Sequence, residues 1–409
     1  MDHFFNVKTL SRVMENLSEF SCVETQVVSV LDAQSRILSE DIKASMDIPG
    51  FRRATMDGYA VISKSTFGAS ESNPAWLEIA GQVNMGQVPD FSLKSGFAAK
   101  ISTGGMLPRG ADSVVMVEHT ETIDETSVEI YKSVAPLQHV IDSSEDFAKN
   151  EIVLQKGLKI RPPEAGLAAA LGYSELEVFK RPCVGIISTG DEVVPVTETP
   201  CPGQIRDINS YTLAGFVKEA GCVPKLYGII KDDIDALFET CKKAVKETDM
   251  ILISGGSSVG ARDFTIDVIN RIENSKILAH GISISPGKPT IFAKVGNKPL
   301  WGIPGQVVSA MVVFKIVVLP FLNKLKGAAK SGDDQFLISA KLSRNVASTQ
   351  GRQDFVRVRL VNKGDILFAE PVLGKSGLIK TMVQADGLLE IGENVEGLEK
   401  GSKVNIIPL

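Results

Sequence analysis

Residues 184–192 read VGIISTGDE, and residues 250–260 read MILISGGSSVG. Each segment is a short apolar run that ends in a polar, glycine-rich turn, which is typical of a buried strand. Further apolar runs lie at 225–230, 290–295 and 300–303. Helical patterns separate the runs, at 210–220, 233–247, 263–273 and 306–319. The alternation predicts parallel βαβ units with helices on both faces of a sheet, and a ligand outside the carboxyl ends of the strands.

The segments on either side of this α/β module have a different texture. From about residue 49 to residue 150, short alternating strands are broken by Gly, Pro and Asn, which predicts an inserted β-rich module. Residues 335–409 return to short strands, which predicts a small β-barrel or sandwich at the end of the chain. The predicted fold class is therefore α/β plus β. A length of 409 residues allows two to four domains at about 150 residues each.

Helical patterns also occur outside the α/β module. Residues 1–20 and 24–45 each carry apolar residues at helical spacing. A further helix is predicted from Pro162, since Pro162 and Pro163 suit a first turn and Gly172 suits a helix end.

The composition is that of an ordinary globular protein. Apolar residues make up 44% and charged residues 23% of the chain, which argues against disorder, collagen and coiled coil. The net charge is −5 and no block of Lys and Arg occurs, so no general footprint for nucleic acid is expected. A local anion site remains open, because a pocket can be basic inside an acidic protein.

The cysteines and the N-terminus favour a cytoplasmic protein. The closest of the five cysteines, Cys183 and Cys201, are 18 positions apart, so we expect reduced thiols and no zinc site. The start, MDHFFNVKTLSRV, lacks the basic and apolar regions of a signal peptide. The most apolar run, Val307–Leu322, is shorter than the ~20 residues of a membrane span and contains Lys315 and Pro320. It predicts a buried helix.

The two glycine-rich turns that follow the strands are candidate anion sites. Glycine lets backbone amides approach an anion closely, and the helix start near Asp263 adds positive potential. The plainer interpretation is that Gly and Ser only form turns. Two such turns at the strand ends of one sheet, both with carboxylates nearby, favour the anion site.

Lys288 is a candidate cation for that anion. In the segment Ser285–Pro289 (SPGKP), the flanking prolines give it a defined direction, which suits a point charge for phosphate or an oxyanion. Pro289 stands where a Walker A loop needs Ser or Thr, and the GKSG segment at 374–377 lacks the upstream Gly. No G-x-G-x-x-G opens a helix, so neither a P-loop nor a dinucleotide site is supported.

Five carboxylates fall after predicted strand ends, namely Asp191, Glu192, Asp232, Asp233 and Asp263. Carboxylates beside phosphate-binding amides suggest Mg²⁺ held between protein and substrate phosphate. For Asp232 and Asp233, helix capping is an equally good interpretation. In the β-rich module, MDGYAV at 56–61 and STGG at 102–105 indicate only turn chemistry on their residues alone.

The motifs taken together are more specific than any one of them. In chain order they are PGFRRATMDGYAV (49–61), KISTGGMLPRGADSVVMVEH (100–119), SEDF (144–147), ISTGDE (187–192), SGGSSVGARDF (254–264), SPGKP (285–289), GIPGQVVSA (302–310), GRQDF (351–355), and GKSG (374–377) before VQADGL (383–388). This series resembles the MoeA-type molybdopterin molybdenumtransferases, the family that includes the carboxy-terminal domain of gephyrin. The resemblance runs from about residue 4 to residue 409.

The resemblance implies an elongated homodimer of four-domain subunits. An elongated linker domain would comprise 21–48 and 151–180, and the β-rich inserted domain 49–150. A MogA-like α/β domain that binds molybdopterin would comprise 1–20 and 181–326, and a C-terminal β-barrel 327–409. The implied reaction inserts molybdate into adenylylated molybdopterin and releases AMP with Mg²⁺. A separate adenylyltransferase would supply the pterin, other proteins would accept the cofactor, and neither nucleic acid nor a membrane is expected to take part.

The resemblance also assigns residues to roles. Asp57, Thr103 and Asp146 of the β-rich module would reach into a cleft formed with the other subunit. Glu192 and Asp263 would hold Mg²⁺ and the adenylate phosphates, assisted by Asp232 or Asp233. The substrate-binding set would be Gly255, Gly256, Ser257, Lys288, Pro289, Ser309, Arg352 and Ser376. Lysine, arginine and hydroxyl donors suit molybdate, a tetrahedral dianion that needs no soft ligand here.

Three positions depart from the family pattern. Ser285 stands where a lysine is usual, Gln306-Val307 where Asn-Pro is usual, and Ser144 where a glycine is usual. The first removes a positive charge, and the second alters the turn before Ser309, since Pro fixes φ and Val does not. The sequence therefore leaves two alternatives open, a catalytically weak paralogue that carries molybdopterin or acts as a scaffold, and an insertase that prefers tungstate.

Overall fold

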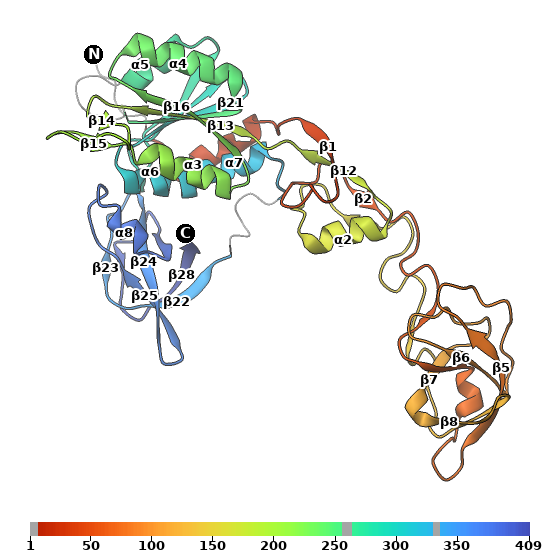
Figure 1. Ribbon diagram of the computed structural model, residues 1–409. Coiled ribbons are helices and arrows are strands. Elements are labelled where there is room, and N and C mark those ends of the chain that lie inside the picture. Colours follow the sequence, from red (N-terminus) through yellow and green to blue (C-terminus); the bar gives the residue numbers. More distant parts are fainter. Residues whose placement is uncertain (1–6, 256–263, 330–335) are drawn as a thin grey trace. The chain divides into compact units, whose positions relative to one another are not determined.

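The protein is represented by a computed structural model, which describes residues 7–255, 264–329 and 336–409 (Figure 1). Its contacts divide the chain into two compact units. The larger unit comprises Met1–Glu40, Lys156–Ala165 and Ser174–Leu409, and the smaller unit comprises Asp41–Gln155 and Gly166–Tyr173. Each unit is described by itself, and the four predicted domain boundaries stay predictions.

The larger unit is built around a six-stranded sheet in the order β16-β13-β17-β21-β20-β18. The strands are β16 (Val223–Ile230), β13 (Cys183–Thr189), β17 (Met250–Ser254), β21 (Lys298–Ile303), β20 (Ile291–Val295) and β18 (Ser275–His280). The first four are mutually parallel, as predicted. The predicted parallel arrangement is wrong for β20, which pairs antiparallel with β21 and β18. Only two residues separate Val295 from Lys298, which permits a hairpin and no crossover helix.

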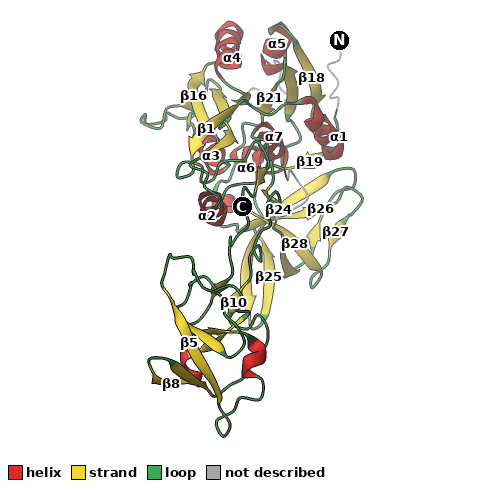
Figure 2. Ribbon diagram, turned by 90° about the vertical axis from the view of Figure 1, so that its right-hand side faces the viewer, coloured by secondary structure: helices red, strands yellow, loops and turns green. Residues whose placement is uncertain are grey.

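Helices cover both faces of this sheet (Figures 1 and 2). Successive side chains of its strands pack against opposite helix layers. In β17, Met250 and Leu252 join a core with α3 (Asn209–Glu219), α6 (Val307–Val313) and α7 (Leu319–Leu325). Ile251 and Ile253 join a second core with α4 (Ile234–Glu247) and α5 (Phe264–Arg271). This period of two is what a strand buried on both faces requires.

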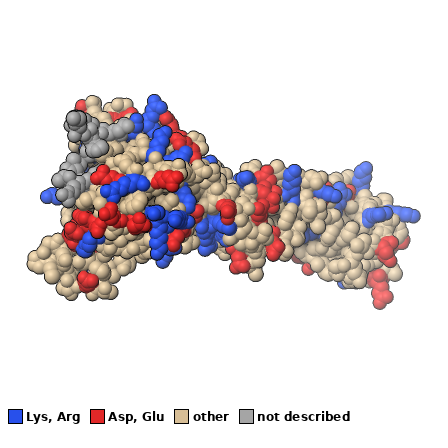
Figure 3. Space-filling model, turned by 90° about the horizontal axis from the view of Figure 1, so that it is seen from above, with Lys and Arg blue, Asp and Glu red and all other residues tan. Residues whose placement is uncertain are grey.

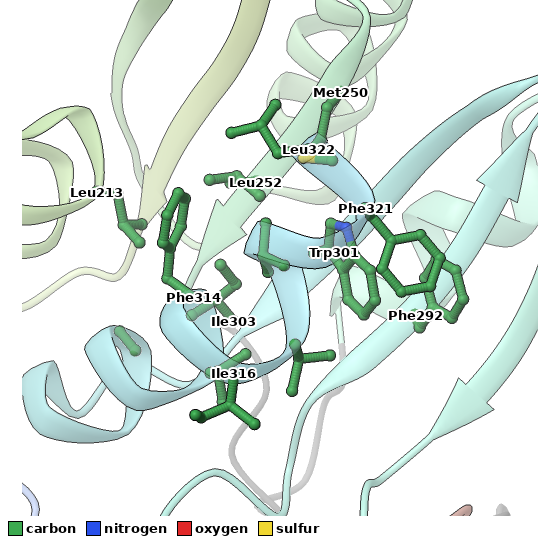
Figure 4. Close-up of a cluster of buried hydrophobic side chains, with 14 of the residues drawn as sticks. Leu213, Met250, Leu252, Phe292, Trp301, Ile303, Phe314, Ile316, Phe321 and Leu322 are labelled. Carbon is green, nitrogen blue, oxygen red and sulfur yellow. The ribbon is translucent and has the colours of Figure 1, made fainter. Parts of the chain in front are cut away.

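The apolar run after residue 306 forms the central core helix, as predicted. It comprises α6, the π-turn segment η4 (Phe314–Val318) and α7. By length and composition alone, Val307–Leu325 is apolar enough to cross a membrane, yet 72% of it is buried inside the protein. Phe321 packs edge-on against Phe292 and Trp301, whose rings stack at 4.0 Å (Figure 4).

The C-terminal part of the larger unit is a closed five-stranded barrel. Its strands follow the order β24 (Gln353–Lys363), β25 (Ile366–Pro371), β22 (Ile338–Leu342), β28 (Lys403–Pro408) and β26 (Gly387–Ile391), and β26 pairs back with β24. The short strand β19 (Ile284–Ser285) adds to β24 and so connects the barrel to the α/β sheet. The predicted small barrel is therefore confirmed.

The smaller unit holds a second six-stranded sheet, in the order β7-β4-β6-β5-β9-β8. Its strands are β7 (Ser113–Met116), β4 (Gly58–Val61), β6 (Phe97–Ile101), β5 (Ala75–Val83), β9 (Ser127–Ile130) and β8 (Thr120–Asp124). Alternating residues pack into two cores, such as Ala60 into one and Val61 into the other. The segment predicted to be β-rich therefore contains this six-stranded sheet.

Of the other predicted helices, one is confirmed, one is shorter and one is wrong. The helix α2 (Pro162–Ala170) begins at Pro162, and α1 covers only Leu10–Met14. Residues 24–45 form no helix. Their first part is β1 (Thr25–Ser29), which pairs antiparallel with β12 (Glu175–Phe179). β-branched residues in TQVVS suit a strand, and this pairing overrides the helical spacing.

Candidate functional site

A cavity of about 930 Å³ lies at the carboxyl ends of β13 and β17 in the larger unit. This is the edge of a parallel sheet at which ligands bind. Its lining comes from the ends of both strands, the segments 205–209, 284–289 and 304–309, and the barrel residues Arg352, Ser376 and Gly377. The α/β sheet and the barrel therefore build the site together.

Gly255 allows the two strand ends to approach closely. Its φ is +103°, and a Cβ there would overlap the carbonyl oxygen of Thr189. Its amide donates to the carbonyl oxygen of Ile303 at 3.1 Å. Only glycine combines this positive φ with so close an approach of a neighbouring carbonyl oxygen without strain.

A buried polar network lines the cavity at the start of α3. Ser188 Oγ and the Ser210 amide both donate to Asp207 Oδ1 at 3.0 Å. Asn209 Nδ2 donates to Ser254 Oγ at 2.7 Å and to the Gly305 carbonyl at 2.9 Å. The sequence motifs do not predict this network. The sequence cue for it is the string RDINS at 206–210, in which polar residues stand at a helix start after a strand.

Lys288 reaches the cavity from a tightly held loop. Gly287 has a φ of +121°, a Cβ there would lie 2.5 Å from Val313 Cγ2, and its carbonyl accepts from Thr290 Oγ1 at 2.6 Å. Among the described residues no carboxylate pairs with Lys288, which is exposed. Its charge is therefore available to a ligand.

Arg352 and Ser376 reach the cavity from the barrel. Arg352 Nε lies 2.9 Å from Asp354 Oδ1, an ion pair without the alignment of a hydrogen bond. Ser348 Oγ donates to the other oxygen of Asp354 at 2.8 Å. The Ser376 carbonyl accepts from the Val308 amide at 3.0 Å, which joins this loop to the start of α6. Buried Arg357 holds the same loop by donating to the Gly374 carbonyl at 2.8 Å.

Seven predicted site residues line this one cavity, namely Glu192, Gly255, Lys288, Pro289, Ser309, Arg352 and Ser376. Gly256, Ser257 and Asp263 lie outside the described residues. Geometry brings the seven together, and their individual roles stay predictions.

The carboxylates near β16 have different surroundings. Asp233 is the N-cap of α4 and accepts from the Asp235 and Ala236 amides at 2.9 and 3.1 Å, so helix capping engages its Oδ1. Burial, and then the charges of Asp191 and Glu192, raises the pKa of Asp232. Neither Asp232 nor Asp233 lines the cavity.

The raised pKa of Asp232 predicts a pH-dependent loss of folding stability. Below the ordinary value of 3.8 the side chain is protonated in both folded and unfolded chains, so it costs nothing. As the pH rises through the folded pKa, the folded state must carry the disfavoured charge and loses stability. We expect Asp232→Asn to stabilise the protein near neutral pH by less than about 1 kcal/mol, because the group is largely exposed.

Urea unfolding of wild type and Asp232→Asn at pH 7 and pH 3 tests this cost. The difference between the two proteins should be present at pH 7 and vanish at pH 3. A variant that is less stable than wild type at pH 7 would contradict it.

In the smaller unit, Asp57 and Thr103 are direct partners. Asp57 Oδ1 accepts from the Thr103 amide at 2.6 Å and from Thr103 Oγ1 at 3.0 Å, and these bonds lower the pKa of Asp57. Asp146 is exposed in the turn that follows Ser144. Ser144 has a φ of +58°, which glycine favours, so serine keeps a glycine-like turn at this departure from the family pattern.

The charges on the surface are mixed. On the face shown in Figure 3, Lys and Arg side chains intermingle with Asp and Glu. Neither sign of charge covers this face alone, in keeping with the small net charge of −5.

Comparison with known proteins identifies the chain. Three family profiles match, the MoeA N-terminal region (domain I and II) over residues 7–172, a probable molybdopterin binding domain over 185–324, and the MoeA C-terminal region (domain IV) over 339–409. A Methanocaldococcus jannaschii protein named for molybdopterin biosynthesis is 38% identical over 96% of this chain and 95% of its own length. The molybdopterin molybdenumtransferase of Bacillus subtilis is 30% identical over 94% and 90%.

Solved structures agree with these matches. A crystal structure of a molybdopterin biosynthesis MoeA protein from Pyrococcus horikoshii OT3 has a TM-score of 0.82 at 30% identity, and covers 99% of this chain and 100% of that one. Fold and cavity thus define a molybdopterin biosynthesis protein of the MoeA type. The chain belongs to the MoeA family of molybdopterin molybdenumtransferases, enzymes of molybdenum cofactor biosynthesis.

Proposed function

We propose that this protein inserts molybdate into adenylylated molybdopterin and releases AMP in a Mg²⁺-dependent reaction. The observation that carries the proposal is one cavity in which Lys288 and Arg352 converge beside the Gly255 turn. Ser309 and Ser376 add hydroxyl groups to its lining. An ammonium group without a carboxylate partner, a guanidinium and hydroxyl donors are the groups that bind a tetrahedral oxyanion.

The acidic group beside this cavity fits Mg²⁺, a hard cation that prefers carboxylate and phosphate oxygens. Glu192 lines the cavity, and its charge and that of Asp191 act on Asp232. Among the described residues no group of three or more His, Cys, Asp or Glu is arranged to hold a metal alone. Glu192 would therefore share the ion with substrate phosphates and with Asp263. When bound, Mg²⁺ neutralises phosphate charge during cleavage.

The protein side of the reaction is positioning and charge. Lys288 and Arg352 attract the oxyanion, and Asp354 fixes the direction of the Arg352 guanidinium. The serines donate hydrogen bonds, and the loop bond between Ser376 and Val308 keeps them in place. Groups held in advance where negative charge gathers cost no reorganisation during the reaction.

We further propose that the protein acts as a cytoplasmic homodimer. In that arrangement Asp57, Thr103 and Asp146 of one subunit would face the cavity of the other. The Asp57–Thr103 pair supports this role, because its hydrogen bonds lower the pKa of Asp57 and so favour the charged carboxylate. A separate adenylyltransferase would supply the pterin, and cofactor-accepting proteins would take up the product.

An AMP-release assay tests the proposed function. Protein, adenylylated molybdopterin and Mg²⁺ are mixed with molybdate, with tungstate or with neither. Molybdate-dependent release that stops on chelation of Mg²⁺ is the expected result. Faster release with tungstate would make tungstate the substrate, and tight pterin binding without release would indicate a carrier.

Ser285 provides a test of the oxyanion pocket. It lines the cavity and lies in register with Asp354, so paired side chains share one face. We expect Ser285→Lys to lower the KM for molybdate by about 3–10-fold, the effect of one nearby partly screened charge. Ser339→Lys, at an exposed position of β22, is the control. An unchanged KM would show that charge at 285 does not limit binding.

A further inference from the structure

Asp207 lines the cavity and has no part in the proposed reaction. It is only 8% exposed, and its Oδ1 is fully engaged by Ser188 Oγ and the Ser210 amide. In the described parts of the chain, no cation pairs with this carboxylate and no donor reaches its Oδ2. Oδ2 is not among the fully buried polar atoms that lack a partner, so it keeps some accessible surface, and Asp207 belongs to the cavity lining.

The Oδ2 oxygen of a largely buried carboxylate, accessible but without a protein partner, is available to a ligand. A carboxylate only accepts hydrogen bonds, so the missing partner must be a donor. Asp207 is therefore suited to a ligand that brings N–H groups. Its negative charge repels a phosphate group or an oxyanion.

The substrate of the proposed function has two nitrogen-rich ends. On adenine, the amino group is flanked by ring nitrogens that accept hydrogen bonds and would face the carboxylate unfavourably. On a pterin, the 2-amino group and the neighbouring ring N–H are adjacent donors that point in the same direction, so both can reach one carboxylate. We propose that Asp207 Oδ2 recognises this amino and N–H edge of the pterin. The assignment rests on the proposed function and adds the orientation of the substrate, with the pterin ring toward α3 and the oxyanion toward Lys288 and Arg352.

Asp207→Asn tests the assignment with little change in structure. The carboxamide has the same shape, and its Oδ1 can still accept from Ser188 and Ser210. Only the accessible oxygen changes, from an acceptor to a donor. We expect affinity for molybdopterin, titrated anaerobically by calorimetry, to fall by about 10–100-fold, the scale of a charged hydrogen bond. Affinity for AMP should stay unchanged, which also reports that the variant is folded.

Asp249→Asn is the matched control. Asp249 caps the opposite, amino end of β13 by accepting from the Cys183 amide at 2.8 Å, and it lies away from the cavity lining. It should leave both affinities unchanged. The assignment is overturned if Asp207→Asn binds molybdopterin like wild type, or if it loses AMP affinity instead. If wild type releases no AMP but Asp207→Asn still loses pterin affinity, the proposed reaction fails and the assignment stands.

Discussion

Lys288→Met is expected to reduce molybdate-dependent AMP release by about 100-fold or more, the scale of removing one preorganised charged group from an active site. Lys288 is exposed to the cavity, and no carboxylate among the described residues neutralises it. Methionine keeps the length of the side chain and removes only the charge. The loss should therefore appear in the dependence on molybdate, while binding of the pterin is preserved.

The control for Lys288 is Lys276→Met, which removes an exposed lysine from strand β18 outside the cavity lining. Initial rates of AMP release across a molybdate series compare the two variants with wild type. Lys276→Met should behave like wild type. A Lys288→Met protein with the wild-type rate at every molybdate concentration would remove this residue from the oxyanion pocket.

Gly255→Ala is expected to destabilise the larger unit by about 3 kcal/mol and to abolish activity, because it combines backbone strain with a steric clash. Its φ is +103°, where an L side chain is disfavoured, and the new Cβ would overlap the Thr189 carbonyl oxygen. Relief of the clash requires β13 and β17 to separate at their carboxyl ends. That movement would widen the cavity at the point where substrate phosphates are expected.

Gly221→Ala separates these two effects. Gly221 also has a positive φ, +77°, but no atom lies within 4 Å of a Cβ there. It should cost only about 1 kcal/mol, the conformational part, and leave activity intact. Thermal unfolding and AMP release are measured on both variants. Equal stability of the two alanine variants would show that the close approach at Thr189 is not a constraint.

Much of the fold follows from local patterns. The apolar runs at 184–188 and 250–254, each followed by a glycine-rich turn, form the strands β13 and β17. Pro162 begins α2 because its φ suits a first turn. Where the local pattern predicted the wrong element, strand pairing in the folded protein determined the secondary structure. Residues 25–29 carry helical spacing, yet they pair with β12. The strand β20 turns back on β21 because two residues leave no room for a helix.

The candidate site was predictable where a motif concentrates unusual residues, as at Lys288 in SPGKP and at Arg352 in GRQDF. It was not predictable where function depends on which polar groups are buried together. Asp207 and Asn209 look like helix-start residues in the sequence. Only the fold shows that Asp207 lines the cavity and that, among the described residues, hydrogen bonds engage only one of its oxygens.

The most direct test of the proposed insertion is the stoichiometry of one turnover. A limiting amount of adenylylated molybdopterin is incubated with excess protein, Mg²⁺ and molybdate, and then AMP, pterin and pterin-bound molybdenum are quantified in the same sample. Molybdate insertion predicts equal amounts of all three, with no AMP when molybdate is omitted. AMP release without molybdenum on the pterin would contradict the proposed insertion and leave a simple hydrolase.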